Sequence, residues 1–215
     1  MKRSVYLIFS LAVLFAACKK DDPVVYTDTQ VGISRVTHYP TFQMTGAGLI
    51  VIVKGSTFTE PGIKAFEGTA QLTIQTTGSV NTNATGIYVI QYSATNKDGF
   101  SSSVSRTVVV IPQHETPGVD LSGSYDYVGS SVYNATVKKI GEGTYSTDNV
   151  WSGGTIIPAL FISVDGINVI VPSQQTPYGT LFGTGTYTSA TKRLVYVLNL
   201  PDFGVSNSTR TWQKK

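Results

Sequence analysis

The sequence predicts an all-β protein built from two successive β domains. Short apolar runs rich in Val, Ile and Tyr alternate with turns of Gly, Pro, Asn and Asp, and no stretch has the spacing of an amphipathic helix. The strongest signal is a hairpin of residues 86–95 and 101–111 around Asp98 and Gly99, because Asp-Gly supplies the positive φ angles of a tight turn. Only 13% of the residues are charged, which is typical of an extracellular β protein.

Residues 1–17 have the pattern of a secretory signal peptide. Lys2 and Arg3 form a short basic start, and an almost wholly apolar run follows from Val5 to Phe15. This run is too short to cross a bilayer, which needs ~20 apolar residues. We therefore expect the segment to be removed during export.

The end of this segment is more specific than an ordinary cleavage site. The sequence Leu-Phe-Ala-Ala-Cys at residues 14–18 resembles the lipobox of bacterial lipoproteins, and Cys18 is the single cysteine of the chain. The resemblance implies cleavage before Cys18 and acyl chains, such as palmitate, on its thiol and its new amine. Several acyl chains hold a protein at a membrane without a transmembrane helix. The alternative is an ordinary signal peptide followed by a chance cysteine.

Residues 18–29 are expected to form a lipidated tether. Lys19-Lys20-Asp21-Asp22 resembles the charged tag of surface-exposed lipoproteins in Bacteroidetes-type bacteria, which implies the cell outer membrane and an outward-facing chain. A solvated tether without a sorting role is compatible with the same residues. Loss of residues 1–17 leaves 14 of the 16 basic residues against 13 acidic ones, a net charge of +1, so a nucleic-acid partner is not expected.

Residues 30–111 are expected to form a β-sandwich. Besides the hairpin, strands are predicted at 30–36, 48–53 and 72–76. In the hairpin, alternate positions from Tyr88 to Ala94 should share one face of the sheet, and so should Val104, Val108 and Val110.

Three segments of this region, 55–65, 86–96 and 105–110, resemble the Ig-like domain family of bacterial surface proteins. They carry its Gly-x-x-Phe-x-Glu-Pro-Gly stretch, its Tyr-x-Val-x-Tyr-x-Ala hairpin with Ile90 at the Val position, and its Arg-x-Val-x-Val strand. The resemblance implies a spacer or display module without catalytic residues. Asn96 and Phe100 replace the usual Asp and Asn of the hairpin, which argues against a metal there.

Residues 112–119 are the predicted linker, because two prolines and a glycine stand between strand-like segments. His114 and Glu115 are expected to be solvated. A metal site needs more ligands than the two histidines of the chain supply, and His38 is distant in sequence. No metal and no cofactor are expected.

Residues 120–215 are predicted to form a second antiparallel domain, either a β-sandwich or a small β-barrel, because glycines and prolines separate evenly spaced strands without crossover helices. Its opening residues 121–125 and closing residues 209–212 resemble the C-terminal domains of small surface lipoproteins from glycan-foraging bacteria. Eight strands are expected, at 123–128, 136–140, 144–147, 156–164, 168–171, 183–188, 194–199 and 208–212.

No catalytic motif for a metal, a nucleotide or a nucleophile occurs in the sequence. Glu142, Asp148, Asp165 and Asp202 could form a glycosidase pair only if the fold brought two together. Carboxylates beside glycine or proline are more often turn residues. We therefore expect a protein that is not an enzyme.

The predicted ligand site rests on two aromatic residues, Trp151 and Tyr178, in polar, glycine-rich loops. Their rings could stack on a neutral sugar while polar neighbours bind its hydroxyls. The alternative is that Trp151 folds back and plugs the domain. The first function hypothesis is a non-catalytic glycan-binding accessory of polysaccharide capture, and the second is a structural or adhesive protein that binds another protein, including outer-membrane proteins. The polar neighbours are Asp148, Asn149, Gln174 and Gln175.

Overall fold

The computed structural model describes residues 30–31 and 34–215. The predictions for residues 1–17, Cys18 and the tether 18–29 lie outside the described residues. Contacts divide the chain into two units, Met1–His38 and Tyr39–Lys215. In the first unit, β1 (Gln30–Val31) pairs with β2 (Ser34–Arg35), where the sequence predicts one continuous strand.

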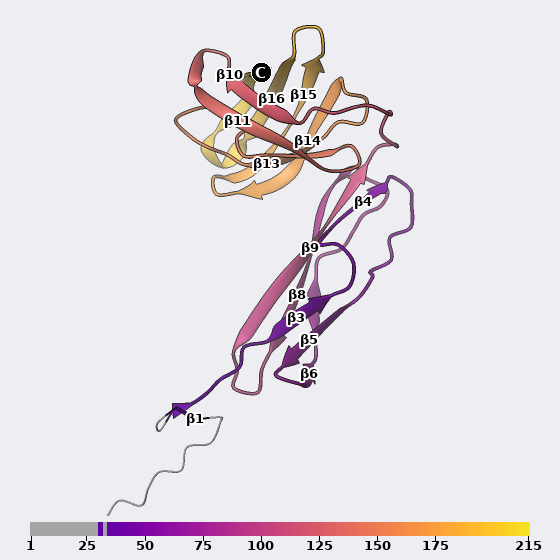
Figure 1. Ribbon diagram of the computed structural model, residues 1–215, viewed down its shortest axis with the longest axis vertical. Helices are drawn as coiled ribbons and strands as arrows, with labels where there is room; N and C mark the ends of the chain where they lie inside the picture. The colour runs from indigo at the N-terminus through magenta and orange to yellow at the C-terminus, as the bar shows by residue number, and fades with distance from the viewer. Residues whose placement is uncertain (1–29, 32–33) are drawn as a thin grey trace, which may run out of the picture. The chain divides into compact units, whose positions relative to one another are not determined.

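The second unit begins with an Ig-like sandwich of two sheets (Figure 1). One sheet has the order β3-β5-β6 and the other β4-β9-β8-β7. The strands of the first sheet are β3 (Thr41–Met44), β5 (Ile63–Glu67) and β6 (Ala70–Leu72). Those of the second are β4 (Leu49–Val53), β7 (Gln75–Thr77), β8 (Gly86–Thr95) and β9 (Ser101–Ile111).

The predicted hairpin β8–β9 has the expected bounds and pairs antiparallel from Gly86↔Val110 to Thr95↔Ser101. Its inner face contributes Ile90, Tyr92 and Val108 to the core between the sheets. At the turn, Asn96 is buried, and its Oδ1 accepts the N–H groups of Asp98 and Phe100 at 3.1 and 2.8 Å. Asparagine therefore fixes this turn through its own amide oxygen.

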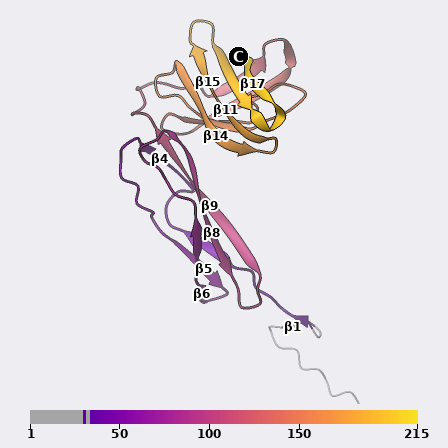
Figure 2. The ribbon, with the colours of Figure 1, turned by 180° about the vertical axis from the view of Figure 1, so that it is seen from behind.

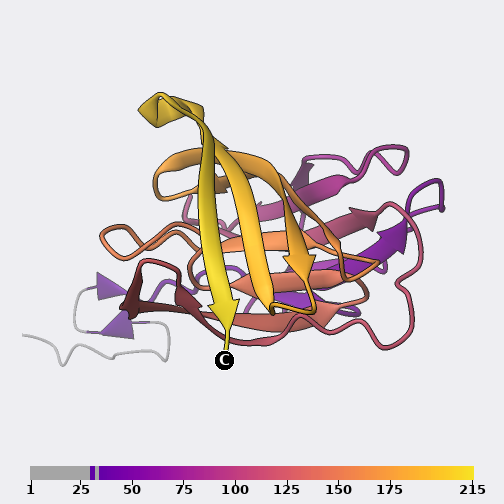
Figure 3. The same ribbon diagram turned by 90° about the horizontal axis from the view of Figure 1, so that it is seen from above.

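Residues 123–214 form a closed barrel of eight antiparallel strands, so the predicted fold class is confirmed and its second domain is the barrel alternative. β10 and β17 close it through the pairs Tyr125↔Lys214 and Tyr127↔Trp212. Figure 3 shows the last strands, orange to yellow, side by side. The strands are β10 (Gly123–Tyr127), β11 (Ser130–Gly141), β12 (Thr144–Thr147), β13 (Ala159–Ile162), β14 (Asn168–Thr176), β15 (Gly179–Thr188), β16 (Arg193–Leu200) and β17 (Val205–Lys214).

The barrel interior is filled with side chains, many of them aromatic. Inward positions alternate along each strand, as in β16, where Leu194, Tyr196, Leu198 and Leu200 are buried. Phe161 stacks on Tyr145, with ring centroids 5.1 Å apart, and meets Tyr196 edge-on at 5.8 Å. Aromatic packing therefore takes the place of the disulfides that this chain cannot form.

The segment between the sandwich and the barrel is bonded to the barrel. Nδ1 of His114 lies 3.0 Å from Oε1 of Glu142, although 82% of the His114 side chain is exposed. Glu115 forms an ion pair with Lys139 at 2.8 Å, and its side chain is only 11% exposed. The expectation of a solvated side chain is wrong for Glu115, because Lys139 of β11 offers it a charged partner. His114 is largely exposed, and its partner Glu142 lies in the turn between β11 and β12. Independent folding of residues 30–111 and 120–215 stays a prediction.

Candidate functional site

The topology brings the two predicted aromatic loops to the same end of the barrel. Each strand reverses the direction of the one before it, so alternate connections meet at one end. The end that follows β10, β12, β14 and β16 carries the β12–β13 loop with Trp151 and the β14–β15 turn with Tyr178. We call it the loop end. Figure 2 shows the barrel strands β14, β15 and β17 from behind.

Trp151 is half-buried at the loop end. Its side chain packs against the barrel core, and the guanidinium carbon of Arg210 lies 4.0 Å from its ring centroid. Its backbone N–H donates to Oδ1 of Asn149 at 2.9 Å. One part of the ring is therefore packed and another part is accessible. This lies between the exposed sugar-stacking ring and the buried plug, the two alternatives that the sequence leaves open.

Asn149 holds the Trp151 loop in shape. It is only 4% exposed, its Oδ1 accepts from two backbone N–H groups, and its Nδ2 donates to the carbonyl of Ser152 at 3.0 Å. Asp148 is exposed, but its Oδ1 accepts the N–H of Thr136 at 2.7 Å. The polar atoms of Asn149 therefore bond within the loop. Asp148 bonds through Oδ1, and its carboxylate is exposed at the rim of the loop end.

Gln174 and Gln175 lie in β14, not in a loop. The Gln174 amide donates to the carbonyl of Leu160 and accepts its N–H, both at 2.8 Å. β13 and β14 are joined by a single backbone pair in the described residues, Ile162↔Ile170. The two bonds of the Gln174 side chain therefore take the place of a second backbone pair between these strands. Gln175 is exposed and bonds the hydroxyl of Thr180 at 2.9 Å.

Tyr178 is half-buried in the two-residue turn between β14 and β15. Its N–H donates to Oγ1 of Thr176 at 3.1 Å, and its ring meets Phe203 edge-on, with centroids 6.2 Å apart. Phe203, in the 3-10 helix η2 (Pro201–Phe203), is 63% exposed. Sequence reasoning missed Phe203 and Arg210. The residues Pro-Asp-Phe-Gly at 201–204 are typical of a turn and could have indicated that Phe203 lies in a loop. The local sequence around Arg210 contains no comparable indication.

The candidate acids of the barrel each accept a hydrogen bond from a backbone N–H group. Glu142 accepts the N–H of Glu115 and a bond from His114, and both lower its pKa. Burial raises the pKa of Asp165, but bonds from Ile167 and Asn168 outweigh it, so the net shift is downward. Asp202 accepts the N–H of Thr180 at 2.7 Å. Among residues 30–31 and 34–215, no group of three or more His, Cys, Asp and Glu could hold a metal ion.

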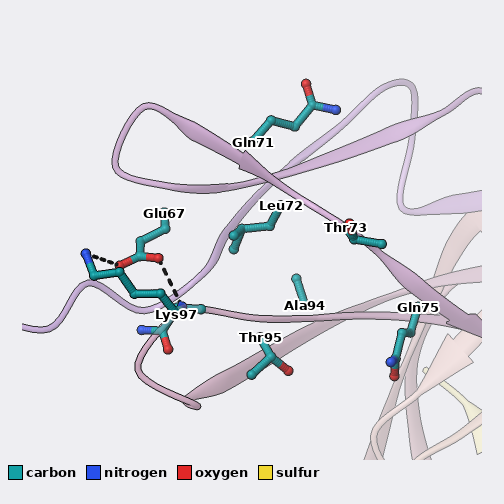
Figure 4. A pocket seen from close by; sticks show the side chains of 9 residues that line it. Glu67, Gln71, Leu72, Thr73, Gln75, Ala94, Thr95 and Lys97 are labelled. Carbon is teal, nitrogen blue, oxygen red and sulfur yellow. Dashed lines mark hydrogen bonds and ion pairs between the residues drawn. The ribbon is translucent and has the colours of Figure 1, made fainter.

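A separate groove of about 450 Å³ lies in the Ig-like domain, beside β6, β7 and the end of β8. Figure 4 shows its rim, where Glu67 and Lys97 face each other. Nζ of Lys97 lies 3.1 Å from Glu67, and the Lys97 N–H donates to the same carboxylate at 3.2 Å. The charges at this rim neutralise each other, so the groove favours neither anions nor cations.

A family model described as the Ig-like domain of bacterial surface proteins matches the first part of this unit. The match covers residues 42–110. The predicted resemblance is confirmed for this region. No curated protein matches the sequence. In the part of the chain that the structure describes, no helix is long and apolar enough to cross a membrane.

The solved structures that match include a lipoprotein from Bacteroides thetaiotaomicron, with 23% identity, a TM-score of 0.40, and coverage of 82% of this chain and 100% of that one. A second contains the catalytic domain of Clostridium perfringens ZmpB with two carbohydrate-binding modules, with 18% identity, a TM-score of 0.32, and coverage of 76% and 14%. A third contains a carbohydrate-binding module of ZmpB in complex with GlcNAc, with 18% identity, a TM-score of 0.31, and coverage of 73% and 29%. TM-scores this low identify no function.

Proposed function

We propose that this protein is a non-catalytic surface lipoprotein, anchored through lipid on Cys18, that binds glycan with the loop end of its barrel. The observation that carries the proposal is the group of accessible aromatic rings at that end. Trp151 and Tyr178 are half-buried, and Phe203 beside Tyr178 is largely exposed. Rings held on a rigid scaffold offer apolar faces to the C–H groups of a sugar, while nearby polar groups bind its hydroxyls.

The polar part of this site is smaller than the sequence predicts. Asn149 bonds to backbone groups of its own loop, and Gln174 bonds to the backbone of Leu160 on β13. We therefore assign Asp148 and Gln175 to the ligand. Arg210 joins the set through its guanidinium, which lies against the Trp151 ring. With few polar groups and open rings, the site should bind weakly and prefer extended glycans that cover several rings.

The binding experiment uses the full chain in a sugar-free detergent on an array of neutral and acidic oligosaccharides. We expect at least one glycan to bind, and Trp151→Ala and Tyr178→Ala each to weaken that binding about tenfold, because stacked aromatic contacts contribute on the order of 1 kcal/mol or more. Ile156→Ala is the matched control, since Ile156 lies in the Trp151 loop, is 63% exposed and has no ring. Binding that survives both ring deletions would remove the loop end as the site.

The same Trp151→Ala variant tests how far the ring belongs to the core. Loss of its packed part and of the Arg210 contact should cost ~1–3 kcal/mol of unfolding free energy, below the ~3–5 kcal/mol of a fully buried aromatic. Thermal and urea unfolding measure this cost. A loss at the upper limit would make Trp151 a plug and leave the site to Tyr178 and Phe203.

The anchor has its own test. Cys18→Ser should block lipid transfer and leave the precursor uncleaved at this site, because the thiol is the acceptor in the lipobox mechanism that the sequence resembles. Metabolic labelling with a fatty-acid analogue, followed by membrane fractionation, measures both effects. Label on the serine variant would contradict the lipobox assignment.

A further inference from the structure

The outer face of the barrel carries a second groove, formed by β14 to β17 and distinct from the loop end. Its volume is about 440 Å³. Phe182 is the aromatic residue in it and is 40% exposed, although it stands in the middle of a strand. The groove is lined by Ser173, Phe182, Thr184, Val197, Asn199 and Asn207, together with Val171 and Gly183.

Two β-bulges flank Phe182 in a single row across four strands. On β14, Pro172 and Ser173 together stand opposite Phe182, because the register shifts between Val171↔Gly183 and Gln174↔Leu181. On the other side, Phe182 pairs with Asn199 of β16.

Asn199 in turn stands opposite a second bulge, made by two residues of β17. The register shifts between Leu198↔Ser208 and Leu200↔Val205, which leaves Ser206 and Asn207 facing Asn199. Bulges on both sides of one residue pair bend the outer strands and re-aim their side chains, which is a device common beside binding sites.

The second bulge holds Asn207 in an unusual backbone conformation. Its φ is +49°, in the left-handed region, and its N–H donates to Oδ1 of Asn199 at 2.9 Å. The structure gives no hydrogen bond to the Asn207 side-chain amide or to Nδ2 of Asn199 among the described residues. The side-chain amides of Asn199 and Asn207 therefore lie in the same groove as the exposed Phe182 ring and can form further hydrogen bonds with a ligand.

We propose that this groove is a second ligand site, which takes a neutral pyranose sugar. No lining residue is ionisable, so the groove offers nothing to a charged ligand. The Phe182 ring supplies an apolar face, while the amides of Asn199 and Asn207 and the hydroxyls of Ser173 and Thr184 supply donors and acceptors. The proposal rests on glycan binding as the function, but it shares no residue with the loop end.

The experiment repeats the oligosaccharide array with the full chain and two groove variants. Phe182→Ala removes the ring. Asn199→Asp keeps the oxygen that accepts from Asn207 but removes the Nδ2 donor, so the bulge is retained. We expect both variants to weaken binding of at least one neutral oligosaccharide about tenfold, with Trp151→Ala leaving that ligand bound. Phe182→Leu, which keeps apolar bulk without a ring, should weaken binding as Phe182→Ala does.

The outcomes separate this groove from the loop end. Losses confined to Trp151→Ala and Tyr178→Ala would overturn the groove and leave the proposed function standing. Losses confined to Phe182→Ala and Asn199→Asp would support the groove and overturn the loop end. If no glycan binds, both proposals fail. Should Phe182→Ala then also lower the particle mass measured by light scattering, the groove is an interface between copies of the chain.

Discussion

The Ig-like domain and the barrel are both antiparallel in large part, but they bury very different side chains. Among the buried residues of the Ig-like domain, Tyr92 is the aromatic one and Arg106 is fully buried, with Phe42, Phe58 and Tyr88 partly buried around them. The buried residues of the barrel core include five aromatic ones: Tyr125, Tyr145, Phe161, Tyr196 and Trp212. The sandwich keeps open sheet edges, and the barrel has none. Because the barrel is closed, its end loops need not cover sheet edges, and they carry rings that could meet a ligand. The Ig-like domain exposes one ring pair of its own, Tyr39 and Phe100, with centroids 5.3 Å apart.

The arginine in the Ig-like domain joins segments that are distant in sequence. Nε and Nη2 of Arg106 both lie 3.0 Å from Oε1 of Glu60, and its other N–H groups donate to the carbonyls of Ala47 and Thr45. Because its side chain is fully buried, these groups replace the water it would otherwise bind. One residue of β9 thereby fixes the loops on both sides of β4.

The largest effect should come from breaking this cluster. Arg106→Met keeps much of the side-chain length but leaves Glu60 and the carbonyls without their donor, so it should cost ~3–5 kcal/mol of unfolding free energy. Glu60→Gln keeps an acceptor oxygen and should cost less. Urea unfolding followed by circular dichroism measures both. A small cost for Arg106→Met would mean that water replaces the guanidinium.

Alkaline pH should weaken the barrel more steeply than the Ig-like domain. Burial raises the pKa of four barrel tyrosines, against Tyr92 alone in the sandwich. The four are Tyr125, Tyr145, Tyr187 and Tyr196. A raised pKa leaves stability intact below pH ~10 and removes it above, since the unfolded chain loses protons that the fold retains. Four such groups in the barrel, against one in the sandwich, predict a steeper loss of stability in the barrel, at no more than about 1.4 kcal/mol per pH unit for each group.

Urea unfolding between pH 9 and 12, with Trp212 fluorescence reporting on the barrel, measures this slope. Tyr196→Phe is the matched control, because its hydroxyl has no hydrogen-bond partner among the described residues and its removal should flatten the slope by about a quarter. Equal slopes in the two regions would contradict the prediction.

The smallest effect concerns the segment 112–119 between the two regions. Glu115 accepts from Tyr145 at 3.1 Å and pairs with Lys139, so Glu115→Gln should cost about 1 kcal/mol and speed proteolytic cleavage within the segment. Limited proteolysis with mass spectrometry measures the rate. His114→Gln, which changes a largely exposed pair, is the control. We expect the fragments 30–111 and 120–215 to persist, and rapid loss of either would contradict independent folding.

The strands could be predicted where side chains alternate, and were missed where they do not. All eight predicted barrel strands overlap observed ones, and β8 and β9 have the expected bounds. β3 and β5 were missed because each is short and mixes polar with apolar residues. The predicted strand 72–76 is divided between β6 and β7, which belong to different sheets.

The candidate site was less predictable, because its side chains bond to partners that the local sequence does not identify. Gln174 of β14 bonds to the backbone of Leu160 on β13, and Arg210 of the last strand contacts the Trp151 ring. The Phe182 groove could not be inferred at all. A bulge changes which residues stand opposite each other without changing either strand's own pattern.

The parallel pairing of β4 with β9 has a mechanical consequence. Five residue pairs, Leu49↔Thr107 to Val53↔Ile111, join the two strands in the same direction. When the two ends of the Ig-like domain are pulled apart, β4 is pulled toward its N-terminal end and β9 toward its C-terminal end. Because the strands are parallel, these forces point in opposite directions along the pair. The load therefore shears all the rungs together, where a hairpin pulled at its open end would unzip one rung at a time. Flow or a bound polymer that tugs on the barrel would meet this resistance before the sandwich extends.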